Sequence, residues 1–247
     1  MPPVRVTVIG DHFMLPEKFI ESLVRLEGAE FAIRQHTQNW PDDDMTHGYQ
    51  PAAWGETAHH AELAGLKEYF GTPEDVIPLI SDAEIYIGHL APITATVLEA
   101  APGLKLIGIS RGGPVNIDLG VARTRGVQVV NTPGRNAGAV AEFTIGMILS
   151  QTRLIAAGHT TLTASGDWNG QLYRADTTGR ELAEMTVGVI GYGHIGTKVV
   201  GHLKSFGCRI LVNDPYVSLS PQDLNDGVEQ VALATVLAMA DVITMHP

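Results

Sequence analysis

The sequence is poor in cysteine and in basic residues. Cys208 is the only cysteine, so no disulfide can form within the chain, and this is typical of a reducing compartment. Because Cys208 opens an apolar segment, we expect a buried and unreactive thiol. Lysine and arginine number 16 against 27 aspartate and glutamate residues, which gives a formal net charge of −11. No basic stripe offsets that charge, which argues against a nucleic-acid or anionic-membrane partner.

Long apolar runs are also missing. No segment approaches the length that spans a membrane. Val4–Gly10 is too short an apolar run for a signal peptide, and Asp11 and His12 follow it directly. We therefore expect a cytoplasmic protein whose hydrophobic content of 45% fills a packed core.

The most informative segment is a strand pattern followed by a glycine-rich turn. Thr186–Ile190 is apolar and β-branched, and the spacing G-x-G-x-x-G follows it at Gly191, Gly193 and Gly196. In a dinucleotide site, the first glycine permits a tight turn, the second leaves room for a pyrophosphate, and the third lets a helix pack on the sheet. The N-terminus of that helix favours an anion, because its first N–H groups are unpaired.

A second predicted strand, Arg209–Asn213, ends at an acidic residue. Asp214 lies about 18 residues beyond Gly196, near the spacing of an acid that accepts hydrogen bonds from the adenosine ribose hydroxyls. Its charge would repel a 2′-phosphate. The segment therefore predicts a dinucleotide site with NAD, rather than NADP, as the cofactor.

Strands and helices alternate in the first half of the chain as well. The predicted strands are Val4–Ile9, Phe31–His36, Ala83–Gly88, Lys105–Ser110 and Val127–Asn131, and the predicted helices are Pro16–Glu27 and Thr94–Ala101. Such alternation predicts an α/β fold with two doubly wound parallel-sheet units in tandem. From Ala137 to about Leu162 one long helical pattern follows, which we interpret as a core helix joining the two units. A subunit contact is an added role for it.

Gly112 and Gly113 follow the predicted strand Lys105–Ser110. They leave backbone amides free at the carboxyl end of a sheet, where α/β proteins bind ligands, so this loop is a candidate anion site.

Two groups of residues contain side chains of the types that bind metal ions. They are His47 with the acids near it, and His59, His60 and Glu62 together. Neighbouring histidines on a helix point in different directions, and the acidic run is typical of a solvated loop. We therefore expect no metal site.

Several motifs follow one another in the order found in a known family. They are Arg111–Asp118 (RGGPVNID), Val130–Asn136 (VNTPGRN), Ala139–Glu142 (AVAE), Trp168, the glycine turn, Asp214–Pro215 and Ala240–His246 (ADVITMH). With these motifs the chain, from Leu104 to its end, resembles the D-2-hydroxyacid dehydrogenases, which include D-3-phosphoglycerate dehydrogenase. The resemblance implies a flavodoxin-like substrate domain in residues 1–132. A Rossmann NAD-binding domain, incomplete at its C-terminus, would follow in residues 133–247.

The resemblance also implies roles for individual residues. Those assigned to the cofactor are Gly191, Gly193, His194, Ile195 and Gly196 along the pyrophosphate, Asp214 with Pro215 at the adenosine ribose, and Pro247 beside the adenosine. Arg111, Gly112 and Gly113 form the loop that holds the substrate carboxylate, and Gly112 also lies on the nicotinamide side. Family members carry a larger residue where Gly112 stands, and Pro114 removes one amide donor, so the substrate preference is left open.

The resemblance implies an NAD-dependent oxidoreductase that interconverts a D-2-hydroxyacid and a 2-oxoacid by hydride transfer. Family members carry an arginine, a glutamate and a catalytic histidine further along, and this chain ends at Pro247 before all three. We therefore expect the catalytic residues beyond Pro247, and no activity from the chain alone. The resemblance further suggests a homodimer across the coenzyme domains. The alternative is an NAD(H)-sensing binding module, as in the C-terminal-binding proteins, which needs the glycines and Asp214 but no turnover.

Overall fold

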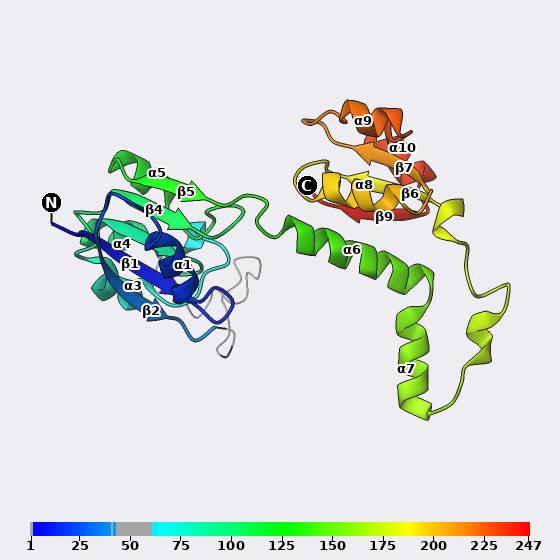
Figure 1. Cartoon of the computed structure of the whole chain (residues 1–247), viewed down its shortest axis with the longest axis horizontal. Coiled ribbons are helices and arrows are strands. Elements are labelled where there is room, and N and C mark those ends of the chain that lie inside the picture. The colour runs from blue at the N-terminus through cyan, green and yellow to red at the C-terminus, as the bar shows by residue number, and fades with distance from the viewer. Residues whose placement is uncertain (1, 41, 43–60) are drawn as a thin grey trace. The chain divides into compact units, whose positions relative to one another are not determined.

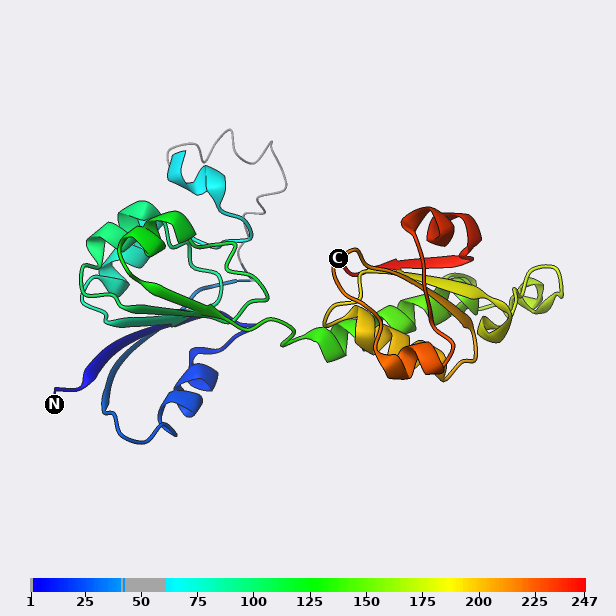
Figure 2. The same cartoon turned by 90° about the horizontal axis from the view of Figure 1, so that it is seen from above.

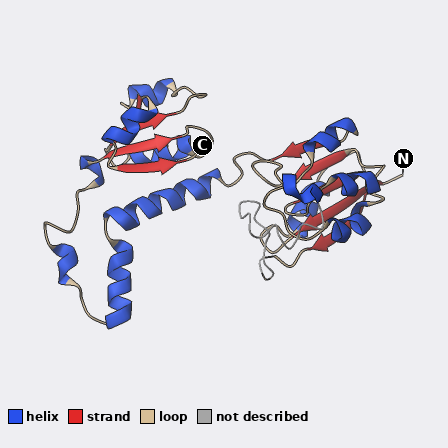
Figure 3. Ribbon diagram, turned by 180° about the vertical axis from the view of Figure 1, so that it is seen from behind, coloured by secondary structure: helices blue, strands red, loops and turns tan. Residues whose placement is uncertain are grey.

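A computed structural model describes residues 2–40, 42 and 61–247 of the chain. The chain divides into two compact units, Met1–Pro133 and Gly134–Pro247, and the predicted boundary after residue 132 lies one residue from this division. Each unit alternates strands with helices and contains a sheet of parallel strands (Figures 1 and 3). The predicted α/β fold with two parallel-sheet units is confirmed.

The first unit is built on a five-stranded parallel sheet with the order β2-β1-β3-β4-β5. The strands are β1 (Val4–Gly10), β2 (Phe31–Thr37), β3 (Ile85–Gly88), β4 (Leu106–Ile109) and β5 (Gln128–Asn131). This order is the flavodoxin-like one, in which the chain moves first to one side of β1 and then to the other. All five predicted strands are present.

Helices cover both faces of this first sheet. They are α1 (Pro16–Leu23), the 3₁₀-helix η2 (Ala61–Gly65), α3 (Pro73–Ile80), α4 (Ala95–Ala100) and α5 (Leu119–Thr124). Figure 2 shows α1 on one face and α3, α4 and α5 on the other. Side chains alternate along a strand, so Val6 and Val8 pack with Leu23 of α1, whereas Ile9 belongs to the larger core under α3 and α4.

The helix predicted from Pro16 to Glu27 is shorter than expected. It ends at Leu23, its last buried residue. Val24 and Leu26, which continue the apolar pattern, are 66% and 58% exposed. With no buried face beyond Leu23, packing does not hold further helical turns.

The second unit is built on four parallel strands in the order β8-β7-β6-β9. The strands are β6 (Thr186–Ile190), β7 (Arg209–Asn213), β8 (Glu229–Gln230) and β9 (Val242–Met245). Counted within the unit, this order is 3-2-1-4, which is the beginning of the Rossmann order. The predicted burial of the cysteine is confirmed: Cys208 is 9% exposed, and burial raises the pKa of its thiol.

The second unit contains helices that pack on both faces of its sheet and others, α7 (Ile155–Ser165) among them, that project away from it (Figure 1). They are α6 (Ala137–Thr152), α7 (Ile155–Ser165), η3 (Gly170–Tyr173), η4 (Leu182–Glu184), α8 (Gly196–Lys204), α9 (Pro221–Asn225) and α10 (Leu233–Met239). Helices α6 and α8 share a core with Val187 and Val189 of β6. Helix α10 packs on the opposite face of β6, where Val236 lies against Gly188.

The prediction of one long helix from Ala137 to Leu162 was wrong. Leu154 has a φ of 55°, in the left-handed region, and this interrupts the helical hydrogen bonds between α6 and α7 (Figure 1). The interpretation as a core helix was also wrong for most of this segment. Helix α6 buries Ala137, Ala141 and Ile148, and α7 buries no residue.

Within the described ranges, none of the helices has both the length and the apolar content that crossing a bilayer requires.

Candidate functional site

The turn between β6 and α8 carries the three glycines of the predicted dinucleotide site. Gly191 has a φ of 93°, and a Cβ at this position would overlap the carbonyl oxygen of His246. A Cβ on Gly196 would overlap the carbonyl oxygen of Gly191. Packing within the protein therefore requires glycine at both ends of the motif.

Gly193, the middle glycine of the motif, differs from the other two. A Cβ at Gly193 would meet no other atom of the chain within 4 Å. Packing within the protein therefore gives no reason for glycine at this position. Open space beside the backbone is what the close approach of a pyrophosphate requires, so the turn fits a dinucleotide.

Asp214 follows β7, and backbone amides hold its carboxylate beside the glycine turn. Tyr192 N donates to Oδ2 at 2.7 Å, while Tyr216 N and Val217 N donate to Oδ1 at 2.7 and 2.9 Å. These hydrogen bonds, that from Tyr192 first, lower the pKa of Asp214. The carboxylate is therefore ionised at neutral pH and fixed in direction, as an acceptor for ribose hydroxyls needs to be.

The remaining predicted cofactor residues lie around the same turn. Ile195 directly precedes α8, and His194 is exposed and lies against Gly134. Pro247 follows the end of β9 and lies next to Gly191, whereas Pro215 is exposed directly after Asp214. The structure thus brings these residues together at the carboxyl end of the second sheet. Their roles toward a cofactor stay predictions.

Tyr192 connects this turn to a second polar cluster that the sequence did not reveal. Its side chain is 3% exposed, and its hydroxyl donates to the carboxylate of Asp223. Asp223 also accepts from Lys204 Nζ at 2.6 Å and from Ser220 Oγ at 2.9 Å. Tyr192 occupies a variable position of the glycine motif, and Asp223 lies 31 residues further along the chain, so the sequence gives no signal for this contact.

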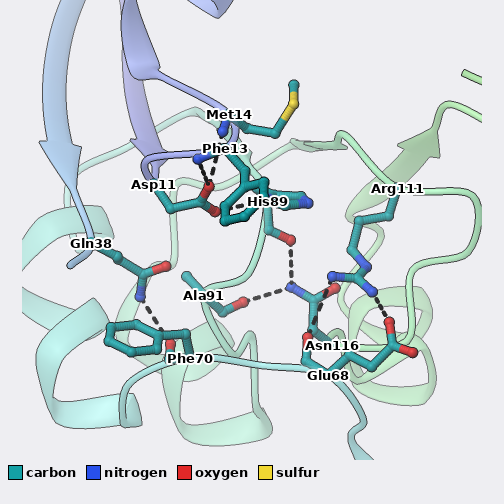
Figure 4. A network of polar contacts seen from close by, with 10 residues as sticks. All are labelled: Asp11, Phe13, Met14, Gln38, Glu68, Phe70, His89, Ala91, Arg111 and Asn116. Carbon is teal, nitrogen blue, oxygen red and sulfur yellow. Dashed lines mark hydrogen bonds and ion pairs between the residues drawn. The ribbon is translucent and has the colours of Figure 1, made fainter. Parts of the chain in front are cut away.

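The predicted substrate loop lies in the first unit, at the carboxyl end of β4. Asn131 Nδ2 donates to the Gly112 carbonyl at 2.7 Å, and Thr132 N donates to the Arg111 carbonyl at 2.9 Å. The Arg111 side chain is 14% exposed, and its guanidinium forms an ion pair with the Glu68 carboxylate (Figure 4). The positive charge of Arg111 is therefore compensated within the protein.

A buried pair of ionisable residues lies at the same edge of the first sheet. Asp11 follows β1 and His89 follows β3, and Asp11 Oδ2 lies 2.6 Å from His89 Nδ1. Their side chains are 0% and 8% exposed. Asp11 Oδ1 accepts from the backbone amides of Phe13 and Met14, both at 2.9 Å. The backbone amides thus engage Oδ1 of Asp11, and Oδ2 faces the His89 ring.

The sequence did contain a signal for this pair. Asp11 and His89 each directly follow a predicted strand, and parallel strands place such residues at one edge. The pairing of β1 with β3, which brings the two residues together, becomes known only from the sheet order.

Of the two groups considered as metal sites, only Asp42 and Glu62 lie within the described residues; Asp42 Oδ2 lies 3.8 Å from His12 Nε2. Glu62 Oε2 accepts from Thr96 N at 3.1 Å and from Thr96 Oγ1 at 2.8 Å. His47, His59 and His60 lie outside the described residues. Elsewhere in the described part of the chain, no group of three potential ligands is arranged to hold a metal ion.

Comparison with known proteins connects these features to a family. Residues 145–247 match the family model described as D-isomer specific 2-hydroxyacid dehydrogenase, NAD binding domain. The D-3-phosphoglycerate dehydrogenase of Methanocaldococcus jannaschii is 36% identical over 179 residues, which cover 71% of this chain and 33% of that protein. The hydroxypyruvate reductase of Thermotoga maritima is 32% identical over 174 residues, which cover 70% of this chain and 54% of that protein.

A solved structure agrees over nearly the whole chain. The apo-structure of D-lactate dehydrogenase from Escherichia coli has 26% sequence identity and a TM-score of 0.66, and the match covers 99% of this chain and 65% of that chain. The two sequence relatives are longer, so this chain spans only about a third to a half of their length. All three proteins are named as dehydrogenases or reductases, which does not favour the alternative of a cofactor-sensing module.

Proposed function

We propose that the protein is a member of the D-isomer-specific 2-hydroxyacid dehydrogenases, an NAD-dependent oxidoreductase that interconverts a D-2-hydroxyacid and a 2-oxoacid; its similarity to that family supports this. The observation that carries this proposal is the glycine turn with open space at Gly193, beside the fixed carboxylate of Asp214. When bound, NAD accepts the hydride from the hydroxyacid, and NADH returns it to the oxoacid.

In this proposal the second unit holds the cofactor. Asp214 accepts from the ribose hydroxyls and repels a 2′-phosphate, which selects NAD. The turn and the N-terminus of α8 receive the pyrophosphate. The residues assigned to these contacts are Gly191, Gly193, His194, Ile195, Gly196, Asp214, Pro215 and Pro247.

The first unit contributes a substrate loop in the same proposal. Arg111, Gly112 and Gly113 bind the carboxylate end of a small 2-hydroxyacid, with Gly112 also toward the nicotinamide. The reaction requires an acid that protonates the developing alkoxide and a cation that holds the substrate in line. We assign neither role to a residue of this chain, so hydride transfer is proposed for the whole protein rather than for these residues alone.

We also propose a cytoplasmic homodimer. Large apolar side chains are exposed on α6 and α7, and they support a contact between two copies: Phe143, Met147, Ile155 and Leu162 are 50% to 69% exposed. A single cysteine supports a reducing compartment.

An assay of NADH oxidation tests the proposed reaction. The product of the whole gene is mixed with NADH and a panel of 2-oxoacids, and NADH absorbance is followed. We expect oxidation with at least one 2-oxoacid and little with NADPH. NADH oxidation by no member of the panel, in a preparation that binds NADH, would contradict the proposed reaction.

A further inference from the structure

Polar and charged side chains lie together at the carboxyl edge of the first sheet. In the order β2-β1-β3 the strand sequence reverses beside β1, and open α/β sheets bind ligands at such a switch point. Asp11 and His89 stand there, at the ends of β1 and β3. The Arg111 loop follows β4, the next strand. A substrate held by the Arg111 loop therefore has this edge as its surroundings.

The charges at this edge compensate one another (Figure 4). Among the residues drawn there, the ionisable groups form two pairs, Arg111 with Glu68 and His89 with Asp11. The two pairs contain one guanidinium, one imidazole and two carboxyl groups. A phosphate, which carries about −1.5 to −2 charges at neutral pH, finds no uncompensated cation in these two pairs.

Glu68 is held in place by its own segment of backbone. Lys67 N donates to the Val115 carbonyl at 2.9 Å, and Phe70 N donates to the Leu90 carbonyl at 3.0 Å. Glu68 itself has a φ of 51°, a left-handed conformation that non-glycine residues rarely adopt. The surrounding contacts therefore impose the position of Glu68, and its carboxylate meets Arg111 where a substrate anion would compete for the guanidinium.

The same edge offers hydrogen-bond acceptors. Within the described residues, Asn116 Oδ1 and Gln38 Oε1 are buried and have no hydrogen-bond partner. Their amide nitrogens are committed: Asn116 Nδ2 donates to the Ala91 carbonyl at 2.8 Å, and Gln38 Nε2 donates to the Phe70 carbonyl at 2.9 Å. The amide oxygens are thereby fixed as acceptors, which suit a hydroxyl donor and not a phosphate.

We propose that this edge receives the far end of an unphosphorylated, hydroxylated 2-hydroxyacid, and that Glu68 disfavours a phosphorylated tail because its charge stays beside Arg111 when the substrate carboxylate binds there. The inference rests on the proposed function and narrows its substrate class. The substrate carboxylate already competes with Glu68 for the guanidinium. A phosphorylated tail then finds no further cation in these two pairs and has to lie beside two carboxylates, which weakens its binding. A tail hydroxyl carries no charge and is not repelled in this way.

Two acids that differ only at the tail provide the test. D-Glycerate and 3-phospho-D-glycerate are each titrated into the full chain with saturating NAD⁺, and binding is followed by ligand-observed NMR. Like charges brought together weaken binding markedly, so we expect D-glycerate to bind about tenfold more tightly or better. D-Lactate, which lacks the tail hydroxyl, should bind more weakly than D-glycerate. These measurements use the unaltered protein and do not depend on any variant folding.

A matched pair of variants tests the role of Glu68. Glu68→Gln keeps the shape and removes the charge, and should reduce the preference for D-glycerate about tenfold by tightening the binding of the phosphorylated acid. Glu84→Gln is the control, because Glu84 pairs with Lys105 at 2.9 Å and with Arg5 at 3.6 Å, at the opposite end of the strands. The control should leave the preference unchanged.

The outcomes separate this inference from the proposed function. A preference of the unaltered protein for 3-phospho-D-glycerate would overturn the inference and leave the proposed function intact. An unchanged preference in folded Glu68→Gln would overturn the role of Glu68. Binding of NAD⁺ but of none of the three acids would overturn both the inference and the assignment of 2-hydroxyacids as substrates.

Discussion

At the scale of single residues, the first two glycines of the turn differ in what a side chain would meet. A Cβ on Gly191 overlaps the His246 carbonyl and needs a φ of 93°, whereas a Cβ on Gly193 meets open space. We expect Gly191→Ala to lower the free energy of unfolding by about 1–3 kcal/mol, because the backbone has to shift. Gly193→Ala should unfold like the unaltered chain and yet bind NADH about tenfold more weakly or worse, because its methyl group occupies the space of the pyrophosphate.

Chemical denaturation and a fluorescence titration with NADH, carried out on both variants, check this contrast. Gly201→Ala is a suitable control, since Gly201 also has open space around it but lies within α8, away from the turn. Unimpaired NADH binding by Gly193→Ala would show that the cofactor does not approach the turn at this point.

Asp214 determines the choice of cofactor in the same proposal. Its carboxylate is fixed by three amide donors and is ionised well below neutral pH. Hydrogen bonds to charged groups contribute about 1.5–3 kcal/mol, so Asp214→Asn should weaken NADH binding by roughly tenfold to a hundredfold. NADPH binding should change less or improve, because the repulsion of the 2′-phosphate is removed.

Parallel titrations of Asp214→Asn with NADH and NADPH measure that discrimination. Asp176→Asn, which alters an exposed acid paired with Arg174, serves as the control. Equal losses for the two cofactors would indicate that Asp214 supports the fold of the turn but does not select between them.

At the scale of elements, Asp223 ties α8 and α9 to the glycine turn. Burial by itself raises the pKa of Asp223, but hydrogen bonds from Lys204, Tyr192 and Ser220 outweigh it, so that the pKa is lowered. A lowered pKa in the folded state stabilises the protein above the unfolded value of about 4, and this stabilisation is lost as the pH falls through the folded pKa. The second unit should therefore lose stability below about pH 4.

Replacement of Asp223 tests the contribution of this cluster. Asp223→Ala leaves the buried Tyr192 hydroxyl without its acceptor and Lys204 with Asp226 alone, which should cost about 1–3 kcal/mol of unfolding free energy at neutral pH. The unfolding free energy of Asp223→Ala should also fall less steeply with decreasing pH than that of the unaltered chain. Glu229→Ala removes an exposed partner of Arg209 and should have a much smaller effect. Denaturant titrations of Asp223→Ala and of the unaltered chain from pH 3 to pH 7 measure this change. If both proteins lost the same unfolding free energy in acid, Asp223 would not contribute to the pH dependence of stability.

The elements also show how far the sequence predicts this structure. The strands and the glycine turn could be predicted because each depends on neighbouring residues: β-branched runs, glycine spacing and an acid after the next strand. The break at Leu154 could not, because apolar residues resume directly after the short polar run Ser150–Arg153 and no glycine or proline marks the break itself. Asp11 and His89 are 78 residues apart, and Glu68 and Arg111 are 43 apart. Only the order of the strands brings such residues together.

At the scale of the whole molecule, each unit contains its own core. One set of buried residues joins β1, β3 and β4 to α3, α4 and α5, and another joins β6 and β7 to α6 and α8. Buried side chains of the second unit are sparse along α6 and absent from α7. The apolar side chains of α6 and α7 therefore stay exposed to water in a single copy. Covering them stabilises the protein, and in our proposal a second copy of the chain covers them.

Phe143 and Met147 test this assembly, because they lie one turn apart on the same side of α6 and are 69% and 55% exposed. Burying each such side chain contributes about 1.5–3 kcal/mol, so a charge at either position should oppose association strongly. In sedimentation velocity the unaltered chain should move with twice the 26.4 kDa mass of one copy, and Phe143→Asp should shift it toward the monomer.

Val24→Asp introduces the same charge at a 66% exposed position of the first unit and should leave the dimer intact. If the unaltered chain sedimented as a monomer at every concentration, a second copy would not cover the exposed face of α6. The proposed homodimer would then be wrong.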